Sequence, residues 1–417
     1  MNEKSLKLTS AILAGVDTGE YDAEISMDEL EELAKTAGAQ TVAHVIQKRA
    51  SIDSATVLGE GKTQEIRELC VQFTDEEGVA PLLIFDLELT ASQIRNIEKI
   101  TQTRVIDRTM LILDIFAMRA NSREGKIQVE LAQLRYRLPR LAGMGTVLSR
   151  LGGGIGTRGP GETQLETDRR HIRRRIDKLS RELRELSGRR EFMRVRRKKD
   201  AVPVGAIVGY TNAGKSTLLN SLTDAGVLAE DRLFATLDPV SRSVELPDGR
   251  SLLLVDTVGL IRRLPHHLVE AFKSTLEEAA NADIILHVQD ISDPESEEKA
   301  QVTGHILTEL GCGGIPSVNI LNKCDLVGEN VRENENTVGV SAKSGAGFPR
   351  MLEVIAANLP ASSKRMRLLL PFDKCGEAAK IRGNGKIFTE EYTEQGLVLD
   401  ALVEARLVKE MSEFMKL

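Results

Sequence analysis

The chain has no tryptophan, few aromatic residues and only four cysteines among 417 residues. Because aromatic residues make up 3% of the chain, its cores must rely on Leu, Ile and Val. The cysteines form no C-x-x-C pair and no zinc-ligand spacing with histidine, which is typical of a reduced protein. Signal-peptide features and apolar runs of membrane-spanning length are also missing. We therefore expect a cytoplasmic protein with no membrane span.

The length predicts two to four domains of an α/β protein. Strand-like and helix-like segments alternate over residues 1–120, which indicates a small parallel-sheet α/β domain. Its strands are expected at 11–16, 41–47, 82–86 and 104–107, and its helices at 63–73, 91–100, 109–119 and after a Ser26 cap. Three further domains are expected: an antiparallel helical hairpin with a glycine-rich tip (121–199), a P-loop α/β domain (200–362) and a small C-terminal α+β domain (363–417).

The sequence from Gly209 to Ser216 fits G-x-x-x-x-G-K-[ST] and lies between a strand-like run, Val204–Val208, and a helix-like segment. Such a loop turns its backbone N–H groups and a helix N-terminus toward phosphates. Lys215 then reaches the β- and γ-phosphates, and Ser216 binds Mg²⁺. The predicted phosphate-binding residues are Gly209, Tyr210, Thr211, Asn212, Ala213, Gly214, Lys215, Ser216 and Thr217.

A second glycine motif, Gly59–Thr63, resembles the end of a P-loop. The first glycine of that motif would fall at Thr56, so we interpret the segment as a loop that opens a helix. A second nucleotide site in this domain stays open as the alternative.

Base selection is predicted from two later segments. Asp325 of Asn322-Lys323-Cys324-Asp325 can accept two hydrogen bonds from guanine, which adenine cannot donate. Lys323 can lie along the base, and Asn322 can brace the loop. Ser341, Ala342 and Lys343 would form the backstop, with the Ala342 N–H directed to guanine O6. The ordered set of motifs predicts binding of GTP and GDP.

The magnesium ion and the γ-phosphate are expected to meet two switch segments. Mg²⁺ would be held by Ser216 and Thr236 and, through water, by Asp256. The expected nucleotide contacts in these segments are Phe234, Ala235, Thr236, Asp256, Thr257, Val258 and Gly259. Leu260 follows where many GTPases carry a water-orienting Gln, which predicts slow hydrolysis stimulated by a partner. Asn212 could hold K⁺ or simply brace its loop, and both readings stay open.

The hairpin combines an apolar seam with excess positive charge. Ile127, Leu131, Leu134 and Leu138 are spaced 4, 3 and 4 residues apart before Pro139, which we expect to stop the helix. Residues 169–199 carry 15 Lys/Arg and 4 Asp/Glu, so they are predicted to meet a polyanion. The intervening loop has eight glycines between 143 and 161, which favours a binding role over a passive linker.

Residues 152–170, Gly-Gly-Gly-Ile-Gly-Thr-Arg-Gly-Pro-Gly-Glu-Thr-Gln-Leu-Glu-Thr-Asp-Arg-Arg, resemble the signature of the HflX family of ribosome-associated GTPases, as do Leu260 and residues 234–239. The resemblance covers the whole length. It implies a monomer whose hairpin tip contacts RNA of the large ribosomal subunit and whose GTP form separates stalled or idle 70S ribosomes under heat or other stress. The expected RNA contacts are Gly152, Gly153, Gly154, Arg158, Arg169, Arg170, Arg173 and Arg174.

The alternative is a GTP-dependent regulatory switch that recruits an acidic protein or a membrane surface. A membrane-bound helix needs an exposed apolar face, whereas the apolar seam here matches a partner helix. The sequence therefore favours the ribosome.

Overall fold

The computed structural model describes residues 9–141, 160–199, 202–223, 233–263, 265, 268, 278–328, 332–359, 363–384 and 386–415. The chain forms two compact units. The first unit comprises Met1–Gly188, Asp231–Asp238 and Arg263–Lys273, and the second unit comprises Arg189–Glu230, Pro239–Arg262 and Ser274–Leu417. Two short segments from the middle of the sequence therefore belong to the N-terminal unit.

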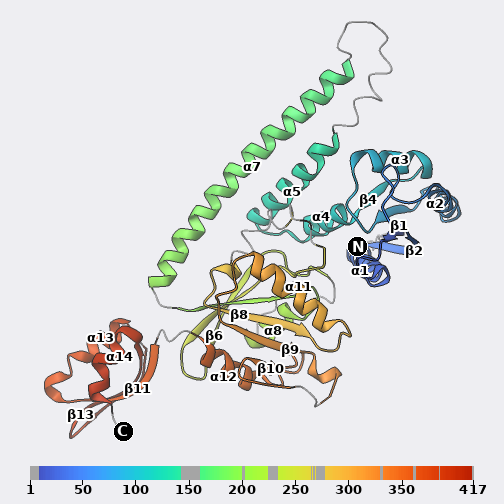
Figure 1. Cartoon of the computed structure of the whole chain (residues 1–417). Helices are drawn as coiled ribbons and strands as arrows, with labels where there is room; N and C mark the ends of the chain where they lie inside the picture. The colour runs from blue at the N-terminus through green and yellow to red at the C-terminus, as the bar shows by residue number, and fades with distance from the viewer. Residues whose placement is uncertain are drawn as a thin grey trace, which may run out of the picture. The chain divides into compact units, whose positions relative to one another are not determined.

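The first unit contains a parallel four-stranded sheet with the order β2-β1-β3-β4. Its strands are β1 (Thr9–Asp17), β2 (Ala39–Lys48), β3 (Leu82–Phe85) and β4 (Val105–Asp107), and its helices are α1 (Ala23–Thr36), α2 (Glu60–Gln72), α3 (Ala91–Thr101) and α4 (Arg108–Arg119) (Figure 1). The core is mainly aliphatic, with Phe85 and Cys70 among its buried members, and includes Ile12, Leu83 and Ile97, each fully buried. The predicted β/α alternation is confirmed.

The first helix begins earlier than predicted. Asp22 is its N-cap and accepts hydrogen bonds from the N–H groups of Glu24 and Ile25. Ser26 lies inside α1, where its hydroxyl donates to buried Asp86 (2.5 Å). The prediction of a Ser26 cap is therefore wrong, because Asp22 supplies the capping carboxylate one turn earlier. Gly59, by contrast, immediately precedes α2, as the predicted helix-opening loop requires.

The hairpin consists of α5 (Arg123–Arg140) and α7 (Pro160–Lys199). Buried Ile127, Leu131 and Leu179 form its seam, and four half-buried residues pack against them: Leu134, Ile176, Leu183 and Leu186. Pro139 lies inside α5, and the helix ends at Arg140, one residue beyond the predicted stop. A proline near the C-terminus of a helix removes a single intrahelical donor, which the helix tolerates.

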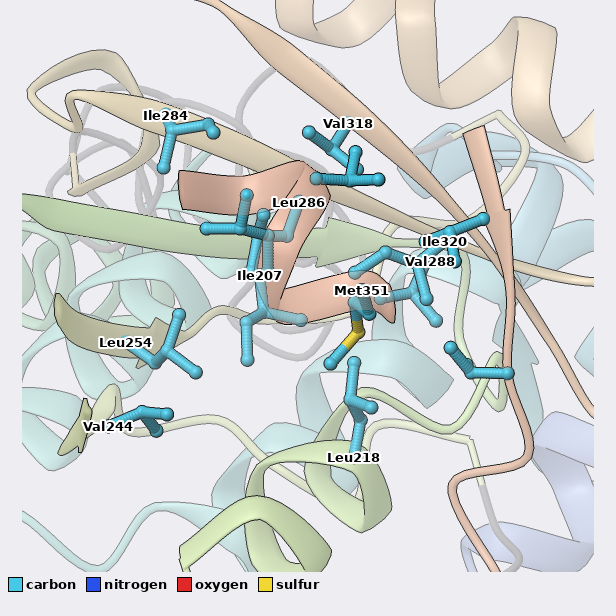
Figure 2. Close-up of a cluster of buried hydrophobic side chains, with 14 of the residues drawn as sticks. Ile207, Leu218, Val244, Leu254, Ile284, Leu286, Val288, Val318, Ile320 and Met351 are labelled. Atoms are coloured by element: carbon cyan, nitrogen blue, oxygen red, sulfur yellow. The ribbon is translucent and has the colours of Figure 1, made fainter. Parts of the chain in front are cut away.

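The second unit contains a six-stranded sheet with the order β10-β9-β8-β5-β7-β6, in which only β6 runs antiparallel to its neighbour. The strands are β5 (Val204–Gly209), β6 (Val240–Glu245), β7 (Ser251–Asp256), β8 (Ile284–Asp290), β9 (Ser317–Asn322) and β10 (Thr337–Gly339). The helices α8 (Lys215–Thr223) and α12 (Phe348–Asn358) contribute to the core on one face, where Leu218 and Met351 meet Ile207 and Leu286 (Figure 2). The sequence also predicts helices at 270–280 and 295–310: the first lies largely outside the described residues, and α11 (Ser296–Glu309) confirms the second.

The C-terminal part of the second unit is a three-stranded antiparallel sheet in the order β11-β13-β12. Its strands are β11 (Ser363–Leu370), β12 (Lys386–Thr393) and β13 (Gly396–Glu404), with helices α13 (Glu377–Asn384) and α14 (Ala405–Met411). The sequence predicts strands at 366–370, 386–392 and 397–402, which are confirmed, but it does not predict α14. Seven residues carry too little periodicity to indicate a helix.

Together these elements confirm the predicted fold class of an α/β protein with a P-loop domain and a small C-terminal α+β region. The four domain boundaries stay predictions. Among the described helices, none has the length and apolarity that a membrane crossing requires.

Candidate nucleotide-binding site

The P-loop follows β5, in the middle of the parallel sheet, and leads into α8. Buried Lys215 donates from Nζ to the carbonyl oxygens of Gly209 (3.1 Å) and Tyr210 (2.8 Å). The loop is thereby wrapped around its own lysine. Burial lowers the pKa of Lys215 to about 8, and bound anionic phosphates would favour its charged form.

The predicted magnesium ligands include two groups that lie together. Ser216 Oγ donates to Asp256 Oδ2 at 2.7 Å, and Asp256 at the end of β7 is fully buried. Oxygen ligands of this kind suit a hard divalent cation held partly through water. The donor set at this position therefore fits Mg²⁺.

The segment after Asp256 is attached to the P-loop through its backbone. The Thr211 N–H donates to the Leu260 carbonyl (2.8 Å), and the Leu260 N–H donates to the Gly209 carbonyl (3.1 Å). A Cβ on Gly259 would lie 2.7 Å from Thr211 Cγ2, so only glycine permits this approach. Leu260 is 2% exposed and contributes main-chain hydrogen bonds at the position where a glutamine would contribute a side chain.

The base-recognition residues are linked to the P-loop by Asn322. Its Nδ2 donates to the Ala213 carbonyl (2.8 Å), and its Oδ1 accepts from the Ala342 N–H (2.9 Å). A Cβ on Gly214 would lie 2.2 Å from this Nδ2. One buried amide therefore joins three of the predicted motifs, as the bracing role expected of Asn322 requires.

The two charged residues of the base loop have different surroundings. Asp325 is exposed, and its carboxylate is stabilised by a hydrogen bond from Ser341 and by nearby Lys343 and Lys323, which lowers its pKa. Lys323 has a left-handed backbone (φ 65°), and its ammonium pairs with Asp290 at 2.6 Å. Asp325 is thus kept ionised as an acceptor, while Lys323 is anchored to the end of β8.

The remaining predicted nucleotide contacts, Phe234, Ala235 and Thr236, belong to the first unit. Phe234 is 2% exposed, has φ 55° and packs edge-on against Phe116 of α4, with ring centroids 4.8 Å apart. Thr236 is half-buried. The other nucleotide motifs lie within the second unit, whereas residues 234–236 belong to the first unit.

Two residues beside the switch motifs make contacts that sequence reasoning missed. Asp238 accepts hydrogen bonds from the N–H groups of Asn121 (2.9 Å) and Ser122 (2.7 Å) at the start of α5. Arg263 donates to buried Asp86 (2.9 Å), and its guanidinium lies over the Tyr21 ring. Their partners are more than a hundred residues away in sequence, so no local pattern could indicate them.

The predicted RNA contacts divide into two groups. Gly152, Gly153, Gly154 and Arg158 lie outside the described residues. Along α7, Arg170, Arg173 and Arg174 are exposed and Arg169 is half-buried. The neighbouring Arg175 instead makes a bidentate ion pair with Glu130 of α5 (2.7 and 2.8 Å). The helix therefore uses one arginine to hold the hairpin and presents others to solvent.

Three features together define a P-loop GTPase. They are a P-loop between a parallel strand and a helix, the Ser216–Asp256 pair, and a base loop braced by Asn322. Comparison with known families agrees: residues 24–117 match "GTP-binding GTPase N-terminal", residues 119–197 match "GTP-binding GTPase Middle Region", and residues 204–323 match "50S ribosome-binding GTPase".

The similarity extends over the whole chain. The GTPase HflX of Caldanaerobacter subterraneus subsp. tengcongensis is 47% identical over 99% of this chain and 95% of its own length. That of Lacrimispora saccharolytica is 50% identical over 96% and 95%, and that of Escherichia coli is 43% identical over 83% and 82%. The chain belongs to the HflX family of GTPases, and it is a GTP hydrolase.

Proposed function

We propose that this GTPase binds the large ribosomal subunit and, in its GTP form, separates stalled or idle 70S ribosomes into subunits, notably under heat or other stress. The observation that carries the proposal is the exposed arginine face of α7, in a chain whose residues 204–323 match a 50S ribosome-binding GTPase. Arg170, Arg173 and Arg174 are suited to RNA phosphates, because guanidinium groups bind phosphate oxygens in pairs. The glycine-rich tip at 152–161 would approach the RNA backbone closely.

In the GTP form, Ser216 and Thr236 would hold Mg²⁺ directly, and Asp256 would hold it through water. Mg²⁺ neutralises charge on the β- and γ-phosphates during transfer to water. The chain's own residues supply the phosphate cradle, with Lys215 as its charged donor and the backbone N–H groups of the loop around it. Asn212 is exposed at the loop, where it would either hold K⁺ or brace the turn.

Hydrolysis by the free protein is proposed to be slow and to accelerate on the ribosome. Leu260 has no side-chain donor or acceptor for the attacking water, so water must be positioned by other groups. The ribosome would complete the site by ordering the switch segments or by contributing polar groups. Because the GTP form binds ribosomes more tightly than the GDP form, ribosomes must favour GTP over GDP by the same factor.

The test is light scattering of purified 70S ribosomes mixed with the full-length protein and either a non-hydrolysable GTP analogue or GDP. We expect dissociation into subunits with the analogue and little with GDP. Equal effects of the two nucleotides, or no binding to the large subunit, would contradict the proposal.

The α7 face is tested by replacing Arg169, Arg170, Arg173 and Arg174 with alanine. Nucleotide affinity is expected to stay unchanged, while ribosome binding weakens and its log–log salt dependence becomes shallower by about 0.7 to 0.9 for each lost phosphate contact. A control variant, Arg67→Ala with Lys99→Ala, removes exposed charges from α2 and α3 and should bind ribosomes normally. Equal weakening in this control would assign the effect to net charge alone.

The second candidate function is a switch that recruits an acidic protein or membrane surface through the same arginines. Sedimentation with large subunits at increasing salt separates the two. Binding that persists at physiological salt supports the ribosome, whereas binding to any polyanion at low salt only would favour the second candidate.

A further inference from the structure

The segment that carries Thr236 is fixed on both sides by the N-terminal fold. Two residues before Thr236, Phe234 is buried against Phe116 of α4. Two residues after it, Asp238 binds the first residues of α5. Leu233 and Leu237 are also buried, at 8% and 3% exposure. A threonine between two such anchors has little freedom to move by itself.

The Asp238 anchor is a cap shared with the hairpin helix. Its Oδ2 accepts the N–H groups of Asn121 and Ser122, and its Oδ1 accepts the Ser122 hydroxyl. Ser122 is itself the N-cap of α5 and accepts the Gly125 N–H (2.9 Å). A carboxylate at this place satisfies helix N-terminal donors and meets the positive end of the helix dipole.

Gly125 leaves the space that Asp238 occupies. A Cβ added at Gly125 would lie 2.3 Å from Asp238 Oδ1, far inside van der Waals contact. The carboxylate would have to move away from α5 to admit a methyl group. A larger residue at Gly125 and a substitution of Asp238 are therefore expected to disrupt the same contact.

Arg263, three residues after Leu260, also belongs to the first unit. Arg263 donates to Asp86 Oδ2 (2.9 Å) and to Ser26 Oγ (3.1 Å), and Asp86 is also bound by Arg108 (2.8 Å). Arg263 has φ 53°, a backbone conformation that most non-glycine residues avoid. The segment of Thr236 and Arg263 are thus both held by the fold that carries the hairpin.

We propose that Asp238 is a positioning residue for the triphosphate form: by anchoring the segment of Thr236 to the N-terminus of α5, it preorganises Thr236 for the Mg²⁺–γ-phosphate group. The inference rests on the assignment of Thr236 in the proposed function and is independent of any action on ribosomes. GDP offers no γ-phosphate, so the anchor contributes to binding of GTP and not of GDP. A γ-phosphate bound through Thr236 would therefore also affect the N-terminus of α5, which Asp238 contacts.

The experiment measures dissociation constants of GDP and of a non-hydrolysable GTP analogue with Mg²⁺, using the full-length protein without ribosomes. Asp238→Ala should weaken the analogue roughly 5- to 20-fold, within the range for coupled sites, and leave GDP unchanged. Gly125→Ala should do the same. Their combination should weaken the analogue no further than the stronger single variant, because both changes break one contact.

Gly61→Ala is the matched control, since Gly61 also lies in the first turn of a helix and a Cβ there meets nothing within 4 Å. It should bind both nucleotides like the wild type. Asp238→Asn keeps the shape of the side chain and should lose less affinity than Asp238→Ala, which provides a test if the alanine variant fails to fold.

Equal loss of GDP and analogue affinity would show a structural role only and overturn the proposal, as would tighter analogue binding or additive effects in the double variant. Thr236→Ala separates the underlying assignment from the anchor. If Thr236→Ala leaves analogue binding unchanged, the magnesium assignment fails. If it weakens binding but Asp238→Ala does not, only the anchor fails.

Discussion

The guanine end of the nucleotide site is cross-linked inside the second unit, whereas the segment that carries Thr236 is packed inside the first. At the guanine end, Asn322 joins the P-loop to Ala342 through two hydrogen bonds. Around Thr236, the anchors are Phe116 and the start of α5. From this difference we infer that one set of residues determines whether a guanine nucleotide binds, while another set discriminates GTP from GDP.

The largest loss of affinity is predicted for a substitution in the loop that binds guanine. Asp325→Asn replaces an acceptor by an amide that presents a donor toward the N1–H and 2-amino donors of guanine. We expect GTP and GDP affinity to fall together, by roughly 2 to 5 kcal/mol for a polar group that the bound base covers and leaves unmatched, and xanthine nucleotides to become the preferred ligands. Competition binding with GDP and xanthosine diphosphate measures this, and unchanged GDP affinity would refute the base assignment.

Asn322→Ala tests whether the brace acts on both nucleotides alike. The substitution leaves the Ala213 carbonyl and the Ala342 N–H without their partner, at a cost of about 1 to 3 kcal/mol for each buried group. GDP and GTP-analogue affinities should therefore decrease by the same factor. Calorimetry on the refolded, nucleotide-free variant checks this, and a loss restricted to the triphosphate would contradict a brace at the guanine end.

A smaller effect is expected from pH. Burial lowers the pKa of Lys215 from 10.5 to about 8, so the nucleotide-free site loses its charge above pH 8. Phosphate binding needs the ammonium form, and affinity for both nucleotides should fall by about tenfold for each pH unit above 8. The unfolded chain binds more protons between pH 8 and 10.5, so stability gains from this group as pH rises through that window. Affinity that stays flat to pH 10 would show that the lysine keeps its proton.

The two regions also differ in how much of each the sequence predicts. Asn322, Asp325 and Lys215 were predicted because their partners follow from fixed motif spacing. The anchors of Asp238 and Arg263 were not predicted, since their partners Ser122 and Asp86 lie more than a hundred residues away in the sequence. Ser26 shows the same limit: it looked like a helix cap, but a long-range bond to Asp86 determines its role.

The smallest expected effect concerns Leu260. Its two hydrogen bonds to the P-loop are made by the backbone, which Leu260→Ala retains. We expect single-turnover hydrolysis to keep most of its rate, both alone and with large subunits, unlike the loss that follows removal of a water-orienting glutamine. Fast hydrolysis by the free wild-type protein, unaffected by ribosomes, would contradict activation by a partner.

The most direct test of the two-region account is the ratio of GTP-analogue to GDP affinity in Asn322→Ala and Asp238→Ala, measured side by side on the isolated protein. The account predicts that Asn322→Ala weakens both nucleotides and leaves the ratio at its wild-type value. It predicts that Asp238→Ala leaves GDP binding intact and shifts the ratio against the analogue. Parallel changes of both affinities in both variants would contradict it, because GTP discrimination would then reside in the same residues as base binding.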